Sequence, residues 1–494
     1  MVINIILAIL VLSIIIIIHE FGHFIVAKAN GITVVEFSLG FGPKLIHFKK
    51  GETEYSLKLL PFGGACIMLG EDFLEADDDE QEDATEGNNT GKAGSELDND
   101  FCNGKTAEDN GFGNTSRYSS DNTSAGSYMS EKKKQEALEA GYDMSKSFAN
   151  KSVWARIAVI AAGPIFNFIL AFVCSVVIIG SIGYDPCMVD VVYDNSPAVS
   201  AGLQEGDKII KVNNQKITFY RDYSFYRVYH ADDTMNITYE RDGQKYTTTL
   251  TPEYVKQQKY QMGVTLEQNG TIAGVSDGTP AQKAGIKKGD IITAVNGVAV
   301  DGSTKIIELV GQCNGESVDI TINRDGNTMQ LNVTPDSVEN EYYYTGFASY
   351  GARQKVSTIS VIGYAFKEVG YSVNTVVKSL GMMFTGQVGI NDLSGPVGTV
   401  SAMSNIVEES KADGTFYVIL NLLNLAGLIS ANLGVMNLLP IPALDGGRLV
   451  FLILEVLRGK PVKKEHEGMV HFVGMIFLFV LMIYVMFKDI RGLF

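Results

Sequence analysis

Cysteine is scarce in this chain of 494 residues, and its positions argue against two common kinds of site. The five cysteines are odd in number and form no Cys-x-x-Cys pair: Cys66, Cys102, Cys174, Cys187 and Cys313. Such a set favours neither a disulfide scaffold nor a structural zinc site. Basic residues are also in the minority, with 40 Lys and Arg against 56 Asp and Glu, and the net charge of −16 argues against nucleic acid as a partner.

The first apolar run could be mistaken for a secretory signal peptide, because Ala27-Lys28-Ala29 imitates a cleavage site. A signal peptide begins with basic residues, however, and none precedes this run, which argues against that interpretation. Hydrophobic residues make up 46% of the sequence and are concentrated in four runs: residues 2–26, 153–182, about 416–439 and about 469–487. Each is near or above the roughly 20 residues that a membrane helix needs. We therefore expect a multi-pass α-helical membrane protein with four spans, in contact with the lipid bilayer of the cell (cytoplasmic) membrane.

The distribution of Lys and Arg predicts the orientation of these spans, because cytoplasmic loops carry an excess of both residues. Clusters follow the first run, precede the second and follow the third: Lys28, Lys44, Lys49 and Lys50; Lys146, Lys151 and Arg156; Arg448, Arg458, Lys460, Lys463 and Lys464. All three clusters can be cytoplasmic together. The two termini and the segment between the second and third runs are then outside.

The first run contains His19, Glu20 and His23. Residues four apart share one face of a helix, so the two imidazoles can bind one metal ion while Glu20 reaches a metal-bound water. Burying ionisable groups at membrane depth costs at least a few kcal/mol, which makes a structural filler role improbable. The alternative is a soluble core helix whose histidines bind backbone carbonyls.

Residues 31–70 contain alternating, β-branched pieces punctuated by glycines, which predicts a membrane-associated β-hairpin. Open strand edges are tolerated at membrane depth where they line a protein cavity. The hairpin can therefore flank the active site and pair with an extended substrate, or it can be an ordinary cytoplasmic hairpin.

Residues 71–147 are rich in Asp, Glu, Asn, Ser and Gly and contain few large apolar residues. Such a segment cannot bury enough surface to offset its chain entropy, so we expect a disordered cytoplasmic insert. It serves as a solvated spacer or, alternatively, as an acidic site for metal or a partner.

Two further clusters lie in the other runs. The second run contains Gly163, Pro164 and Asn167, which suggests a kink and a polar group turned towards other helices. This segment either has a role in the architecture of the active site or only holds helices together. After the third run, Pro440 and Pro442 break the helix, and we expect Asp445 to be presented from non-helical backbone, where its carboxylate can complete the metal site.

A repeat lies between residues 185 and 340. Ser196-Pro197-Ala with Gly202, Gly206 and Asp207 recurs 83 residues later as Thr279-Pro280-Ala with Gly285, Gly289 and Asp290, and the same offset relates Asn213 to Asn296 and Arg241 to Arg324. Each copy is long enough to have its own core. Both copies resemble a PDZ domain, a fold that binds extended peptides at a sheet edge. The alternative is that the two domains are only spacers or steric walls.

Taken together, these motifs resemble the site-2 protease family of intramembrane zinc metalloproteases, of the regulator of sigma-E protease type with two PDZ domains. The resemblance implies that Zn²⁺ is bound by His19, His23 and Asp445, that Glu20 is the general base, and that Asn437 contacts substrate; Asn167 is a further substrate-binding candidate. It also implies regulated intramembrane proteolysis of single-span membrane proteins, such as an anti-sigma factor, that an upstream site-1 type protease has already shortened. The metal site is then near the cytoplasmic side and the PDZ-like domains are outside.

The expected fold class is a four-span α-helical membrane protein with a membrane-associated β-hairpin and two inserted PDZ-like α+β domains. The predicted boundaries are 1–70 for the first span and hairpin, 71–147 for the insert, 148–184 for the second span, 185–260 and 261–340 for the PDZ-like domains, 341–412 for an amphipathic helical linker, 413–465 for the third span with the Asp-Gly motif, and 466–494 for the fourth span. Two other functions stay open: a membrane metal transporter, which tandem peptide-binding domains do not suit, and a non-catalytic PDZ scaffold, which needs no Glu20.

Overall fold

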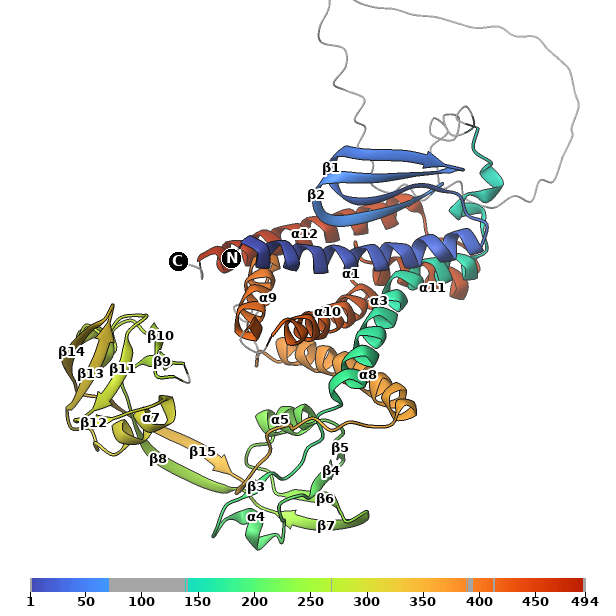
Figure 1. Ribbon diagram of the computed structural model, residues 1–494. Helices are drawn as coiled ribbons and strands as arrows, with labels where there is room; N and C mark the ends of the chain where they lie inside the picture. Colours follow the sequence, from blue (N-terminus) through green and yellow to red (C-terminus); the bar gives the residue numbers. More distant parts are fainter. Residues whose placement is uncertain are drawn as a thin grey trace, which may run out of the picture. The chain divides into compact units, whose positions relative to one another are not determined.

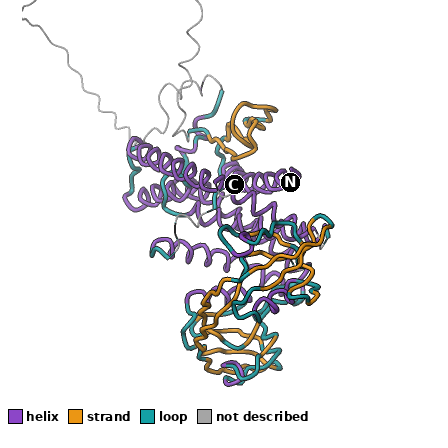
Figure 2. The backbone as a smooth tube through the Cα atoms, turned by 90° about the vertical axis from the view of Figure 1, so that its left-hand side faces the viewer, coloured by secondary structure: helices purple, strands orange, loops and turns teal. Residues whose placement is uncertain are grey.

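A computed structural model describes residues 2–70, 138, 141–267, 269–387, 389, 394–411 and 414–491. Most of the predicted acidic insert lies outside the described residues. The chain divides into two compact units: unit 1 contains Met1–Gly183 and Val356–Phe494, and unit 2 contains Tyr184–Lys355. Helices dominate unit 1 and strands dominate unit 2 (Figures 1 and 2).

The helices of unit 1 are α1 (Val2–Ala29), α3 (Val153–Ile182), α8 (Thr358–Phe384), α9 (Pro396–Ser410), α10 (Thr415–Leu438), α11 (Asp445–Arg458) and α12 (Lys464–Arg491). Four segments are long and apolar enough to cross a membrane: Asn4–Ala29, Val153–Ile182, Thr415–Leu438 and Glu465–Arg491. They coincide with the four predicted runs. The prediction of a multi-pass helical membrane protein is therefore confirmed.

Small residues bring α10 close to α3. A β-carbon added to Gly434 would lie 2.9 Å from Cε1 of Phe168, and one added to Gly427 would lie 3.2 Å from Cβ of Cys174. The Ser430 hydroxyl donates a hydrogen bond to the backbone carbonyl of Asn167 over 2.8 Å. Helices in lipid associate through such close packing and interhelical hydrogen bonds, because lipid tails are as apolar as the side chains. This face of α10 therefore fixes it against the middle of α3.

The prolines interrupt the third run as predicted, because α10 ends at Leu438 and a short loop follows. One expectation was wrong: Asp445 is the first residue of helix α11 rather than part of non-helical backbone. A carboxylate is stable in a first helical turn, where unpaired N–H groups lie nearby. Within the segment predicted as a helical linker, α9 begins at Pro396, a residue suited to the first position of a helix.

The predicted hairpin consists of two long strands, β1 (Val34–Lys50) and β2 (Thr53–Met68), drawn in blue in Figure 1. Both strands change partner along their length, since Phe37 of β1 pairs with Tyr55 and also with Cys66, while Phe48 pairs with Tyr55 on its other side. The first half of β1 therefore lies between the two halves of β2. The Gly64–Met68 half of β2 has a pairing partner on one side only among the described residues, so it forms an edge of the sheet.

Unit 2 contains the repeat, and the two copies have the same topology. Their four-stranded sheets have the orders β5-β4-β6-β7 and β12-β11-β13-β14. The elements of the first copy are β3 (Val191–Val192), α4 (Pro197–Ser200), β4 (Lys208–Val212), β5 (Gln215–Lys216), α5 (Tyr220–Tyr229), β6 (Met235–Arg241) and β7 (Gln244–Leu250). Those of the second are β9 (Val264–Leu266), β10 (Ile272–Val275), α6 (Pro280–Lys283), β11 (Ile291–Val295), β12 (Val298–Ala299), α7 (Ser303–Gly311), β13 (Val318–Arg324) and β14 (Asn327–Val333). Each copy has its own buried cluster of apolar side chains.

The two copies are nested rather than strung one after the other. Strands β8 (Glu253–Gln261) and β15 (Asp336–Tyr344) pair along their whole length and enclose the second copy between them. The chain then returns as β16 (Phe347–Ala348), which pairs with β3, and Phe347 is buried in the core of the first copy. The first domain is thus completed by residues that lie after the second domain in the sequence.

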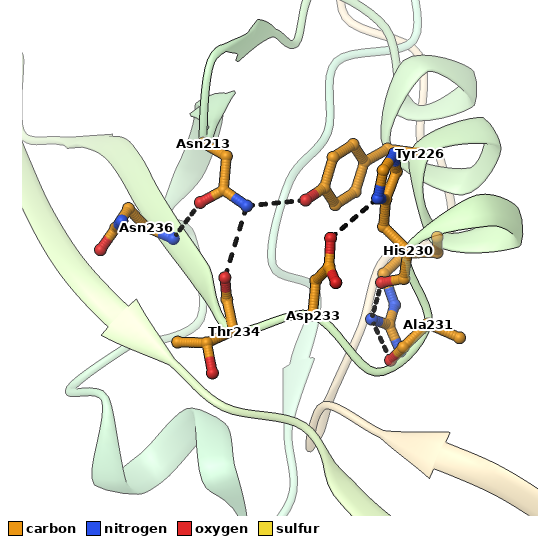
Figure 3. A network of polar contacts seen from close by, with 8 residues as sticks. Asn213, Tyr226, His230, Ala231, Asp233, Thr234 and Asn236 are labelled. Atoms are coloured by element: carbon orange, nitrogen blue, oxygen red, sulfur yellow. Dashed lines mark hydrogen bonds and ion pairs between the residues drawn. The ribbon is translucent and has the colours of Figure 1, made fainter.

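Repeated polar residues have structural roles in both copies. Asn213 and Asn296 adopt left-handed backbone conformations at the turns after β4 and β11, and the Oδ1 of each accepts a hydrogen bond from the N–H of Asn236 or Asp319. The Asn213 amide also donates a hydrogen bond of 2.7 Å to the Tyr226 hydroxyl (Figure 3). Asn tolerates this backbone conformation better than most residues. These residues therefore shape turns and need no catalytic role.

The repeated Asp and Arg form an ion pair inside each domain. Arg324 donates two hydrogen bonds of 2.7 Å to the carboxylate of Asp290, which is 1% exposed, and Arg241 binds Asp207 in the same way. Arg324 beside Asp290 holds the pKa of that carboxyl below its ordinary value. A group with a lowered folded-state pKa stabilises the fold above its unfolded pKa, here about 4. This contribution is lost as the pH falls through the lowered value.

We predict that Asp290→Asn destabilises the second domain at pH 7 by about 2 kcal/mol, because it removes a charge-assisted bidentate interaction from a buried site. Hydrogen–deuterium exchange of β13 in the full-length protein in detergent should show faster exchange in the variant. The difference from the wild type should shrink as the pH falls below about 4. The exposed Asp301 provides the control, since Asp301→Asn should leave exchange unchanged. Equal protection of β13 in wild type and Asp290→Asn at pH 7 would contradict the prediction.

Candidate metal centre

His19 and His23 project from one face of α1 towards α3 and are both buried, at 7% and 6% exposure. Their spacing of one helical turn puts them on the same face. The two helices approach closely there because Gly22 has no side chain: a β-carbon at that position would lie 2.5 Å from the carbonyl oxygen of Ala162. The sequence of α1 therefore places both imidazoles in the interface with α3.

The backbone of α3 orients the ring of His23. Its Nδ1 lies 2.8 Å from the carbonyl oxygen of Val159, which can only accept, so Nδ1 carries the proton. The lone pair of Nε2 is then available to a metal ion. This nitrogen lies 3.3 Å from Nε2 of His19. In metal sites, the ring nitrogen of a histidine that does not bind the metal regularly donates to such a carbonyl, which fixes the tautomer.

Asp445 completes a group of three possible metal ligands. Its Oδ2 lies 3.2 Å from Nε2 of His19 and 3.5 Å from Nε2 of His23. Within the described part of the chain, no group donates a hydrogen bond to this buried oxygen. A carboxylate oxygen that is out of contact with water needs either a hydrogen-bond donor or a cation. No other group of three His, Cys, Asp or Glu residues with this spacing was found among the described residues.

The spacing of the three donor atoms fits zinc. Zinc–nitrogen and zinc–oxygen bonds of about 2.0–2.2 Å in a tetrahedron separate neighbouring donors by about 3.3–3.6 Å. The three separations of 3.2, 3.3 and 3.5 Å are close to this value. Two imidazoles and one carboxylate are also a ligand set that leaves one position of a catalytic zinc open.

Gly163 of α3 provides the space for this group. A β-carbon at Gly163 would lie 2.3 Å from Nε2 of His23 and 2.7 Å from Cε1 of His19. Any side chain would therefore enter the volume between the ring nitrogens. The sequence predicted a kink at Gly163 and Pro164 and left a role of this segment in the active-site architecture open, but it did not predict the contact of Gly163 with both rings.

The two candidate asparagines both contact His19. Asn167 is fully buried, and its Nδ2 lies 3.1 Å from Nδ1 of His19, while its own Oδ1 has no hydrogen-bond partner among the described residues. If the amide is rotated by 180°, Oδ1 can accept a hydrogen bond from a proton on Nδ1 of His19, and the lone pair of Nε2 is then available to a metal ion. Asn437 is half-buried, and its Nδ2 lies 3.4 Å from that Nε2. Contact of either residue with substrate stays a prediction.

Glu20 lies between the metal group and the hairpin. Its side chain is half-buried. A β-carbon at Gly64, on the edge half of β2, would lie 2.9 Å from Cγ of Glu20. The sheet edge therefore runs directly beside the carboxylate predicted to act as the base.

We predict that Gly163→Ala lowers bound metal to a small fraction of the wild-type level, because its methyl group would displace the ring of His23 from Asp445. The measurement is the metal content of the purified protein. Gly180→Ala on the same helix is the matched control, since a β-carbon there would meet nothing closer than 4.0 Å. Wild-type metal content in Gly163→Ala would mean that the ion binds elsewhere.

The chain is similar to known proteins along nearly its whole length. The family model for peptidase family M50 matches residues 7–481. The zinc metalloprotease RasP of Bacillus licheniformis is 30% identical over 98% of both chains. The regulator of sigma-W protease RasP of Bacillus subtilis is 30% identical over 96% of this chain and 95% of the relative.

Solved structures with partial similarity include two HtrA-type proteins. A PDZ domain of HtrA3 bound to a phage-derived ligand covers 17% of this chain and 93% of its own, with 21% identity and a TM-score of 0.16. The HtrA-type protease AlgW with a decapeptide covers 27% of this chain and 50% of its own, with 12% identity and a TM-score of 0.18. Because the family model covers nearly the whole chain and includes both ends of the metal site, the chain belongs to peptidase family M50 and is a multi-pass membrane zinc metalloprotease.

Proposed function

We propose that this metalloprotease hydrolyses peptide bonds within the transmembrane segments of single-span membrane proteins that another protease has already shortened. The observation that carries the proposal is the position of the ligand group. His19 and His23 lie within a candidate membrane span, against a second span, with Glu20 beside them. Because the chain belongs to a peptidase family, a metal transporter or a non-catalytic scaffold is no longer supported.

His19, His23 and Asp445 are the proposed zinc ligands. When bound, zinc lowers the pKa of a coordinated water and polarises the carbonyl of the scissile bond. Glu20 accepts the proton of the attacking water and passes it to the leaving amine. Asn437 is half-buried, with its Nδ2 near Nε2 of His19, and its proposed role is to donate a hydrogen bond to the substrate. The proposed role of Asn167 is to orient the ring of His19 through a hydrogen bond to Nδ1, the ring nitrogen that does not bind zinc.

A transmembrane helix must be unwound before a protease can cut it, since its backbone carbonyls are occupied by helical hydrogen bonds. The edge half of β2, Gly64–Met68, offers unpaired backbone groups beside Glu20. An extended substrate segment that pairs with this edge exposes its peptide bonds to the metal group. This supports the hairpin as a substrate platform rather than an ordinary cytoplasmic hairpin.

An anti-sigma factor is the substrate class that we favour. The support is the name of the Bacillus subtilis relative, a regulator of sigma-W protease. From the Lys and Arg clusters we infer that the metal group faces the cytoplasm and that unit 2 is outside, so an upstream site-1 type protease would act on the outer part of the substrate.

We predict that two carboxylate substitutions both lower activity but differ in their effect on bound zinc. Glu20→Gln should keep bound zinc near the wild-type level and lower the rate of cleavage by about 100-fold to 10,000-fold, because it removes a base but no ligand. Asp445→Ala should lower zinc content and activity together. Both are measured on purified protein, by metal analysis and by cleavage of a trimmed single-span substrate. Near wild-type turnover in Glu20→Gln would contradict the proposed mechanism, and full zinc in Asp445→Ala would place the third ligand elsewhere.

We further predict that unit 2 excludes substrates with a bulky outer domain. Replacing Tyr184–Lys355 by a flexible linker between α3 and α8 should let the enzyme cut full-length substrates that the wild type leaves intact, because a steric barrier has been removed. The measurement is the cleavage rate of full-length against trimmed substrate.

A second variant separates the two domains. Gln261 and Asp336 are paired neighbours at the end of the β8–β15 ladder, so a two-residue Asn-Gly turn can join them and remove residues 262–335 alone. The first domain, including β16, then stays complete. An unchanged preference for trimmed substrate in both variants would leave the domains as spacers.

A further inference from the structure

The loop between α10 and α11 has a strained backbone conformation close to Asp445. Ala443, two residues before Asp445, has a φ of +74°, in the left-handed region that residues with a β-carbon avoid. Such a conformation persists only where its surroundings impose it. Something outside the loop must therefore hold Ala443.

His471 of α12 makes the contact that holds this residue. The N–H of Ala443 donates a hydrogen bond of 2.9 Å to Nδ1 of His471. The histidine is 4% exposed, although its neighbours Met469, Phe472 and Val473 are between 49% and 61% exposed. A polar ring turned inwards from a helix that otherwise exposes apolar side chains is costly in a membrane protein unless it has a specific partner.

A second contact on α12 brings the helix directly against the loop. Gly474 lies one turn after His471, and a β-carbon there would lie 2.4 Å from Cβ of Pro442 and 2.8 Å from its carbonyl oxygen. The loop also packs tightly on its other side, because a β-carbon at Gly447 would lie 2.5 Å from the carbonyl oxygen of Ile441. The loop is thus enclosed between α11 and α12.

The far end of α12 is held on the same face. Asp489 lies 18 residues after His471, which is about five helical turns, so both side chains point the same way. Its Oδ2 accepts hydrogen bonds from the N–H groups of Gly395 and Gly398, at the start of α9. These contacts fix the rotation of α12 about its axis. His471 is therefore presented to Ala443 by a helix that cannot turn freely.

We propose that His471 is a positioning residue of the metal centre: by holding the N–H of Ala443, it keeps the loop in the conformation that places Asp445 opposite His19 and His23. The inference rests on the proposed role of Asp445 as a zinc ligand. His471 touches neither the metal group nor the substrate, so its effect is on the affinity for zinc. Loss of a residue that orients a ligand lowers metal affinity by about 10-fold to 100-fold.

The test compares three variants of the full-length protein in detergent. His471→Phe keeps a ring of similar size but has no acceptor for the N–H of Ala443, whereas His471→Asn keeps an acceptor oxygen close to the position of Nδ1. His466→Phe makes the same exchange at an exposed position of the same helix. The measurement is the zinc dissociation constant in competition with a chelator, together with thermal unfolding of the metal-free protein.

We expect zinc affinity to fall by about 10-fold to 100-fold in His471→Phe and to stay near the wild-type value in His471→Asn and His466→Phe, with metal-free unfolding alike in all three. Adding Ala443→Gly to His471→Phe should restore part of the affinity, since glycine adopts a positive φ without strain. Wild-type affinity in His471→Phe, or equal losses in His471→Phe and His471→Asn, would overturn the proposal.

A further variant covers the case in which His471→Phe does not accumulate. Gly474→Ala leaves His471 in place but pushes Pro442 away from α12, and it should also lower zinc affinity; an unchanged affinity would overturn the proposal. The role of Asp445 is tested separately. If Asp445→Ala retains zinc, the proposed ligand set fails, whereas loss of zinc in Asp445→Ala with wild-type affinity in His471→Phe rejects only the positioning role.

Discussion

The close contact of α1 with α3 is the constraint on which the metal centre depends. Two glycines, one on each helix, bring the backbones together at the level of the two histidines: Gly22 faces Ala162, and Gly163 faces the rings. Backbone approach of this kind is how helices associate where no hydrophobic force drives them together. It also supplies the polar group that a buried imidazole needs, because the carbonyl of Val159 comes within 2.8 Å of His23.

The third ligand is added by a different kind of structure. Asp445 follows a proline-broken loop and starts a new helix, so its position depends on how that loop is supported. The supports come from α12, through His471 and Gly474, and from the packing of α11 on the loop. A metal site assembled from α1 and the first residue of α11 therefore depends on α12, a helix that contributes no ligand.

Unit 2 shows a similar dependence between segments far apart in sequence. The second domain is inserted between β8 and β15, and the strand that follows it completes the first domain. The glycines before β9 and β16 make equivalent contacts, Gly263 with Thr279 and Gly346 with Ser196. These pairs share the offset of 83 residues, so β16 corresponds to the opening strand of another copy. No further repeat follows β16 within unit 2, and β16 pairs with β3 of the first domain instead.

The sequence by itself determined the features that local pattern controls: four apolar runs, the one-turn spacing of His19 and His23, the helix break at Pro440 and Pro442, and the repeat of 83 residues. Each follows from the periodicity or the backbone restrictions of neighbouring residues. Only the tertiary structure decided which atoms meet. The distances from Asp445 to the histidines, the contact of Gly163 with both rings, the hold of His471 on Ala443 and the return of β16 to the first domain all join segments far apart in the chain. Such contacts depend on packing between elements, and no pattern within one stretch of sequence encodes them.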